Sequence, residues 1–147
     1  MPSLRNEKDR QGLVERLHTV KREARPQWGS LDAPRMMCHL NDSLGAGLGK
    51  LEVPRKGPAA FRHFPLKHLA IYVVPMPKNA KAPAELLART PADFEEERRQ
   101  LLQAMEQMAA MPTGAGPEHF LLGAMSYDQW NALNWKHIDH HLRQFGA

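Results

Sequence analysis

The chain has 147 residues, of which 42% are hydrophobic and 24% charged, with eight histidines and one cysteine. This length can bury one core without disulfides, and the composition excludes disordered, collagen-like and coiled-coil proteins. One cysteine excludes an internal disulfide and a cysteine-rich zinc site, so any metal ion must be held by histidines and carboxylates. We therefore predict a single domain, residues 1–147, in which histidine is the residue type most informative about function.

The net charge of +4 is unevenly distributed along the chain. Residues 1–89 carry 16 Lys and Arg against 8 Asp and Glu, whereas residues 90–147 carry 4 against 8. The basic residues are dispersed and belong to no recognisable nucleic-acid-binding motif, so nucleic-acid binding is not expected. A charged start without an apolar segment, and no stretch long enough to cross a bilayer, predict a cytoplasmic protein that does not enter the membrane.

Hydrophobic periodicity and capping residues predict four long helices. The expected helices are Asn6–Ala24, a second from Ser30 or Asp32 to about residue 48, a third from Thr90 to just before Pro112, and a fourth from Ser126 to Gln144 or Phe145. With no convincing run of strands, the pattern favours an all-α fold, an antiparallel four-helix bundle.

The middle third of the chain differs from these helices because it is rich in proline. Seven of the twelve prolines lie between Pro54 and Pro91, which excludes a continuous helix or a central strand there. Its one apolar piece, residues 66–74, fits two helical turns better than a short strand. We therefore predict a long Pro-rich connection between the second and third helices of the bundle.

Two histidines of the last predicted helix are spaced to act together. His137 and His141 share one helix face, opposite the charged Lys136 and Arg143, and so should point into the bundle. Two histidines at this spacing can bind one metal ion, although the spacing also fits a pair of hydrogen-bonded core histidines. His39, at the edge of the apolar face of the second helix, is the candidate for a third ligand. Three histidines and an open position suit zinc, nickel or ferrous iron.

Other polar residues of these helices receive lesser roles. His140 is expected at the surface or behind the ligands, and His119 as a cap or stacking partner near the last helix, where it could also close a pocket. Cys38 lies about 100° around the helix from His39 and is expected to be a small buried residue. Arg98 falls among apolar positions of the third helix, where it either extends to solvent or offers a cation to an anionic ligand.

Three segments that include these histidines resemble one family. They are residues 28–39, with a Trp-Gly turn leading to a Met and then His39; residues 119–123; and residues 130–146, with the His-x-x-x-His pair. Together they resemble an uncharacterised DinB-like branch of the DinB/YfiT-like proteins. Arg35 and Phe120 differ from that pattern, in which an amide and a proline are expected.

The resemblance implies a bundle in which His39, His137 and His141 bind a divalent metal ion. Since some similar proteins are metal-dependent thiol transferases, it also implies a transferase or hydrolase that activates a low-molecular-weight thiol or water for a small-molecule substrate. A homodimer is expected on the same ground. The alternative is a non-catalytic metal-binding or stress-response module, because no acid, base or nucleophile is evident beyond the histidines. Three basic residues could hold the carboxylates of a thiol: Arg55, Lys56 and Arg62.

Overall fold

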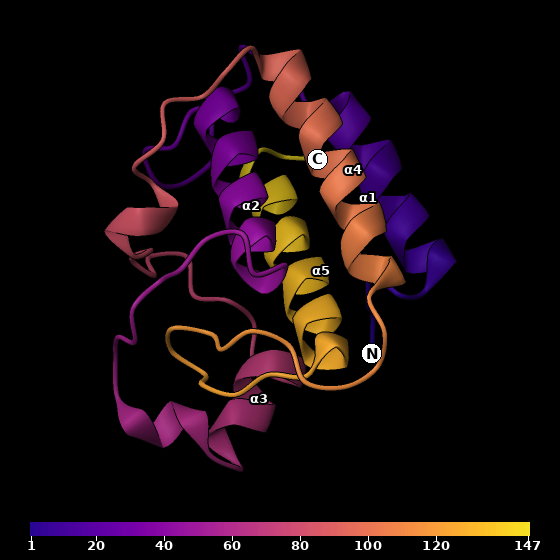
Figure 1. The fold of residues 1–147 in the computed structure, drawn as a ribbon. Helices are drawn as coiled ribbons and strands as arrows, with labels where there is room; N and C mark the ends of the chain where they lie inside the picture. The colour runs from indigo at the N-terminus through magenta and orange to yellow at the C-terminus, as the bar shows by residue number, and fades with distance from the viewer.

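The computed structural model describes residues 1–147 and contains helices but no β-strand, which confirms the predicted all-α class. The helices are α1 (Glu7–Thr19), α2 (Ala33–Gly47), α3 (Leu66–Tyr72), α4 (Phe94–Ala110) and α5 (Tyr127–Gln144), with short 3₁₀ helices at Ala59–Arg62 and Ala84–Leu86. In Figure 1, α1, α2, α4 and α5 lie side by side and α3 lies near their lower end. None of the helices has the length and apolar character needed to cross a membrane.

Local sequence signals set the starts of α2 and α5, the two helices that carry the candidate ligands. The Asp32 side chain accepts a hydrogen bond from the Arg35 backbone N–H, and Pro34 occupies the first turn, where its missing N–H leaves no bond unmade. Ser126 and Gln129 form a reciprocal capping box at the start of α5. Both helices begin where capping chemistry predicts.

Two other boundaries differ from the predicted ones. α1 ends before Val20 rather than at Ala24, because Val20 is extended and its carbonyl accepts a hydrogen bond from Arg98 of α4. α4 is capped by Asp93 rather than Thr90, since the Asp93 carboxylate accepts hydrogen bonds from the backbone at the start of that helix. A tertiary contact therefore sets the end of α1, and a different capping residue sets the start of α4.

The directions of the helices differ from a uniformly antiparallel bundle. α2 runs parallel to α4. Asn41 donates to Glu97, and Lys50, which is later in the first segment, donates to Gln107, which is later in the second. α2 and α5 run antiparallel (Figure 1). Residues 48–93 cause this order, because they carry the chain back to the end of the molecule at which α2 began. Within them, the predicted helix at 66–74 is present as α3.

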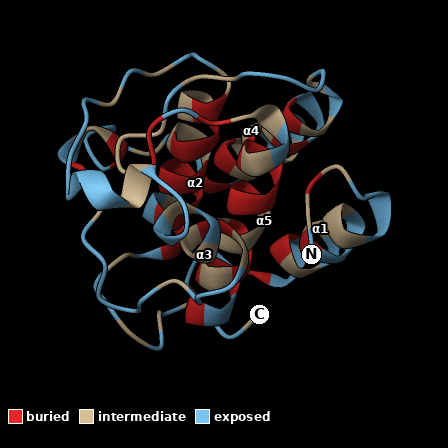
Figure 2. Ribbon diagram, turned by 90° about the horizontal axis from the view of Figure 1, so that it is seen from below, coloured by how far each residue is buried: buried red, intermediate tan, exposed pale blue.

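Buried residues gather where the long helices face one another, whereas most of residues 48–93 is exposed (Figure 2). Met105 and Met108 are fully buried core residues, as their spacing predicts. The largest fully buried side chains are Leu4, Leu13, Leu17, Met36, Met37, Leu40, Leu44, Ile71, Leu101, Met105, Met108 and Ile138.

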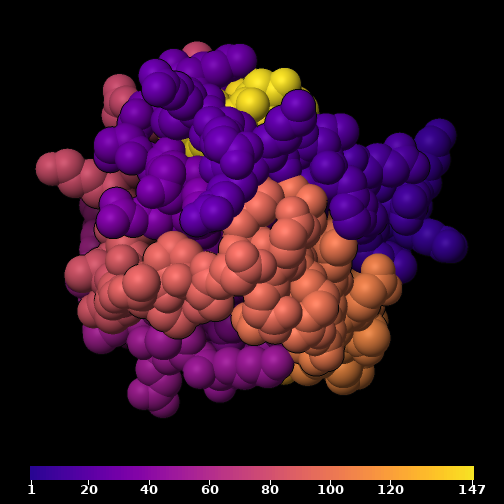
Figure 3. Space-filling model, turned by 90° about the horizontal axis from the view of Figure 1, so that it is seen from above, coloured from indigo at the N-terminus to yellow at the C-terminus, as the bar shows by residue number.

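The segment between α1 and α2 encloses the C-terminal end of α5. The Gln27 N–H donates to the Gln144 carbonyl at 2.7 Å, and the Gln144 side-chain amide donates to the Trp28 carbonyl at 2.8 Å. Seen from above in Figure 3, the yellow C-terminal residues lie among the purple residues of this segment. These contacts fix the last turns of α5, where His141 lies.

Candidate metal centre

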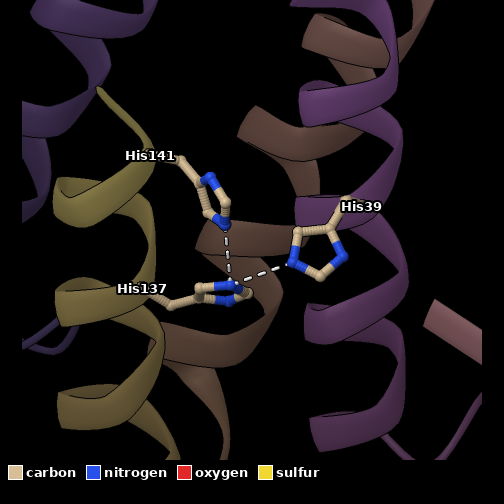
Figure 4. Close-up of side chains that lie close together, drawn as sticks. All are labelled: His39, His137 and His141. Carbon is tan, nitrogen blue, oxygen red and sulfur yellow. Dashed lines mark hydrogen bonds between the residues drawn. The ribbon is translucent and has the colours of Figure 1, made fainter. Parts of the chain in front are cut away.

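The structure brings the three predicted ligands together. His39 projects from α2 and the other two from α5, with their rings facing one another (Figure 4). Nε2 of His137 lies 3.1 Å from Nε2 of His39 and 3.1 Å from Nε2 of His141. One nitrogen of each ring lies within 4.8 Å of the others, a spacing at which all three could hold one metal ion.

Close packing of α2 against α5 makes this meeting possible. Gly47 of α2 lies against Trp130 of α5, and a Cβ atom at residue 47 would be 2.8 Å from the indole ring. A larger residue would therefore push the two helices apart. Because α2 and α5 are antiparallel, His39 lies beside His137 and His141, which are one helical turn apart.

The other ring nitrogen of two histidines is held by an acceptor oxygen. Nδ1 of His39 lies 3.0 Å from the Leu86 carbonyl oxygen, and Nδ1 of His141 lies 2.7 Å from Oε1 of Gln144. Gln144 is held in this orientation because its amide nitrogen donates to the Trp28 carbonyl. Since a carbonyl oxygen only accepts, Nδ1 of both rings carries the proton and Nε2 of both presents a lone pair.

These tautomers leave the cluster with more lone pairs than protons. The His137 Nε2–H can donate to only one of the two neighbouring Nε2 atoms, so one lone pair is left over. Burial, with the neighbouring histidines, lowers the pKa of His141 to about 3 and that of His137 well below its ordinary value. Extra protons are thus disfavoured, whereas a cation would satisfy all three nitrogens. The donor set fits a divalent ion that accepts imidazole ligands.

A cavity of about 1470 Å³ adjoins the cluster, and all three histidines line it. Its walls come from α2 and α5, from the segments around residues 49–55 and 74–87, and from α3 and residues 117–122. His137 is only partly buried because its ring faces this space. A metal ion held by the three histidines would therefore be open to a ligand from the cavity side.

Two further histidines line the same cavity outside the cluster. His140 packs edge-on against Trp28, with ring centroids 5.6 Å apart. Nδ1 of His119 accepts hydrogen bonds from the backbone N–H groups of Leu121 and Leu122, and its ring packs against Trp130. His119 thus has the predicted stacking role against α5, whereas its hydrogen bonds hold the turn at residues 121–122 and Ser126 caps the helix.

Cys38 and Arg98 lie away from the histidine cluster. Cys38 is buried, its Sγ lies 3.6 Å from the Arg89 carbonyl, and burial raises the pKa of its thiol to about 11. Arg98 contacts Val20 and pairs with Glu95, and it does not line the cavity. The alternative in which Arg98 offers its charge to a ligand in this cavity is therefore wrong.

The three basic residues predicted to bind a thiol's carboxylates have different surroundings. Arg55 lines the cavity, but its guanidinium binds both oxygens of Glu118. Lys56 pairs with Glu85 at 3.7 Å, and Arg62 packs against the backbone of residue 123; neither lines the cavity.

Sequence reasoning missed the oxygens that orient the histidines. Gln144 carries a usable signal, since it is three residues after His141 on the same helix face. Leu86 carries none, because its backbone carbonyl reaches His39 across 47 residues of chain.

The fold and this site define the class of protein: it is all-helical and has a histidine cluster at a cavity. In a comparison with protein-family models, residues 6–147 match the family described as "Protein of unknown function (DUF1569)", and the chain therefore belongs to that family. Searches of curated proteins and of solved structures found no match.

Proposed function

We propose that this protein binds one divalent metal ion, zinc, nickel or ferrous iron, through His39, His137 and His141, and uses it as a transferase or hydrolase. The observation that carries the proposal is the convergence of three Nε2 atoms whose lone pairs exceed the available protons. Leu86 and Gln144 support it, because acceptors on the outer nitrogens are the usual means of orienting metal-binding histidines.

The chain's own residues support a chemical role rather than metal storage. Three protein ligands would leave a bound ion able to take a further ligand, and the cavity that the histidines line would give access to it, as in catalytic metal sites. A divalent ion in such a site supplies Lewis acidity, which lowers the pKa of a thiol or a water molecule. The cavity is larger than the roughly 300–1,000 Å³ of typical single-ligand pockets, so it has room for a low-molecular-weight thiol beside a second substrate. This favours transfer over hydrolysis.

A non-catalytic metal-binding or stress-response module is the second candidate. It is favoured because several polar groups that line the cavity are already engaged by other groups of the chain. Both hydrogen bonds to Nδ1 of His119 come from the backbone, Lys136 donates to the Ala70 carbonyl, and Glu118 is held by Arg55. This candidate retains the metal site and lacks turnover.

The proposal includes the finer architecture that the sequence resemblance implies. The four long helices, with residues 48–93 as the connection between α2 and α4, would form a DinB-like four-helix bundle. A homodimer in the cytoplasm belongs to the same proposal. The packing of α1, α2, α4 and α5 and the position of the histidines on α2 and α5 support the bundle alone; the homodimer and its location rest on the resemblance.

Metal titration of chelator-treated protein tests the binding step. Zinc, nickel and cobalt are added in a calorimeter to the wild type and to His39→Ala, His137→Ala and His141→Ala. We expect one equivalent to bind the wild type and affinity to fall at least a hundredfold in each variant. His18→Ala, an exposed histidine on α1, is the matched control and should bind like the wild type. Equal affinity in all five proteins would contradict the metal site.

A thiol assay then separates the two candidate functions. Metal-loaded protein is incubated with glutathione, cysteine or another small thiol and an electrophile, and thiol loss is followed. Metal-dependent loss that His137→Ala abolishes supports the transferase. If the protein binds one equivalent of metal but neither consumes the thiol nor hydrolyses the electrophile, the result supports the non-catalytic module.

A further inference from the structure

Asn134 is a buried amide that makes no hydrogen bond and lines the cavity beside the histidine cluster. Its residue is 2% exposed, and its Nδ2 atom is buried without a partner. An unpaired buried amide costs about 1–3 kcal/mol, which folding alone does not recover. A polar atom of a cavity ligand would satisfy it.

The position of Asn134 relates it directly to the proposed metal site. It is three residues before His137 on α5, on the face that also carries His141, and thus one turn away from the cluster. Ser43 occupies the corresponding turn of α2, four residues after His39, and also lines the cavity. Its hydroxyl donates to the His39 carbonyl, and no hydrogen bond joins it to Asn134. A single ligand with one end near the three histidines would therefore reach Asn134, one helical turn away, with an oxygen that accepts its amide N–H.

The charge of the cavity wall indicates the sign of this ligand. Three lysines that line it form no ion pair with a carboxylate of the chain: Lys78, Lys81 and Lys136. Of the two acidic lining residues, Glu118 is paired with Arg55 and only Glu52 is free. The unpaired charges thus favour an anion.

The remaining wall is largely apolar, with side chains such as Leu51, Leu69 and Met76. Pockets of this kind bind molecules with an apolar body and a few polar groups that fix their orientation. A purely polar anion would leave these side chains in contact with water.

We propose that Asn134 binds a carboxylate or carbonyl oxygen of an amphipathic anion in the cavity and so positions that molecule beside the histidine cluster. The inference rests on the proposed function, since it names the class of substrate that the metal site would take. Asn134 acts as a binding residue, with its amide N–H donating to the ligand oxygen.

Octanoate is the probe for this site, with octylammonium and 1-octanol as probes of equal chain length and different charge. Each is titrated calorimetrically into metal-free and zinc-saturated protein. We expect octanoate to bind at least tenfold more tightly than either of the others. No octanoate binding, or a preference for octylammonium, would overturn the inference.

Two leucine variants separate binding from folding. Asn134→Leu removes the unpaired amide, so its melting temperature should equal or exceed that of the wild type while octanoate affinity falls at least tenfold. Asn131→Leu is the matched control on the same helix, because the Asn131 amide donates to the Met108 and Tyr127 carbonyls and does not line the cavity. It should melt at a lower temperature and keep its octanoate affinity.

Unchanged octanoate affinity in Asn134→Leu would overturn the role of Asn134, as would a loss of melting temperature as large as that of Asn131→Leu. Zinc affinity, measured on the same variants, is expected to stay unchanged. Failure of zinc to bind any of these proteins would contradict the proposed function alone, because the metal-free titration still tests the octanoate site.

Discussion

Two polar clusters, each with buried members, lie close together beside α2, and they differ in whether the chain satisfies their buried polar atoms. The first, which we call the Glu97 cluster, contains Asn41, Asp42, Arg89 and Glu97. The Glu97 carboxylate is fully buried and accepts hydrogen bonds from Arg89, Asn41 and the backbone of Ala92. Burial alone would raise the pKa of Glu97, but these donors hold it below its ordinary value.

The histidine cluster starts one turn away on the same helix and is built differently. The chain supplies acceptors for its outer nitrogens, at Leu86 and Gln144, but too few protons for the inner ones. Burial therefore does not distinguish a structural cluster from a binding site. The balance of donors and acceptors does, and it indicates that only the histidine cluster needs a group from outside the chain.

The largest effect is expected from breaking the Glu97 cluster. Arg89→Met leaves the buried Glu97 carboxylate without its charged partner, which should lower the free energy of unfolding by about 3 kcal/mol, the low end for a buried pair because Arg89 is itself partly exposed. Urea unfolding with chelator present measures this loss. The control is Arg99→Met, because Arg99 and Glu96 form an exposed pair whose loss should change the free energy of unfolding little. Similar losses in the two variants would show that the Glu97 cluster is not a structural unit.

Metal addition should act on the histidine cluster alone. Zinc at a hundredfold excess over its dissociation constant should raise the free energy of unfolding by about 2.7 kcal/mol, because only the folded chain holds the site together. His137→Ala should show no increase, whereas Arg89→Met should show the same increase as the wild type, measured by urea unfolding with and without zinc. A zinc effect that persisted in His137→Ala would contradict the comparison.

His119 is a partly buried histidine whose acceptor nitrogen is already satisfied by backbone N–H groups. Burial and the nearby Lys67 lower its pKa to about 4, below the ordinary value of 6.5, so the folded state favours the neutral ring. Its contribution to stability is therefore present above pH 6.5 and is lost as the pH falls toward 4.

His119→Asn keeps an acceptor for the backbone N–H groups but does not titrate. Between pH 7.5 and pH 5, the metal-free wild type should lose about 2 kcal/mol more of its free energy of unfolding than this variant. Urea unfolding at the two pH values measures the difference. Parallel losses in the two proteins would show that His119 is not held neutral.

The smallest effect concerns the acceptor that orients His141. Gln144→Met removes the oxygen that fixes Nδ1–H, and zinc affinity should fall about tenfold, less than on removal of a ligand. Gln144→Glu keeps an acceptor for Nδ1–H but loses the donor to the Trp28 carbonyl, so it should retain more zinc affinity than Gln144→Met. Calorimetric titration compares the two, and equal loss in both would mean that side-chain packing, not the hydrogen bond, sets the affinity.

Most of the helical framework and the candidate ligands could be predicted from the sequence because their signals are local. Asp32 and Ser126 mark helix starts through their own backbone neighbours, and the spacing of His137 and His141 places both on one face. His39 could be selected because it lies at the edge of an apolar face. The predictions for these residues rest on capping residues and helical periodicity, which can be read from one sequence.

The rest depends on contacts between distant segments. The end of α1 is set by Arg98 reaching the Val20 carbonyl across 78 residues, and the parallel pairing of α2 with α4 by the path of residues 48–93. The position of Asn134 on the inward face of α5 could be predicted. Its lack of a hydrogen-bond partner could not, because that depends on which groups of other segments surround it.

His39 and His137 are 98 residues apart in the chain, and one ion bound to both would close a loop of that length. A disulfide that closed such a loop would act on the unfolded chain, whereas the ion is held only by the folded chain and stabilises it through its binding free energy. Residues 48–93 and 111–126, which build much of the cavity wall, would lie within the closed loop. A chain whose single cysteine cannot form an internal disulfide would thus obtain from a metal ion a cross-link of its folded state, one that opens when the chain unfolds.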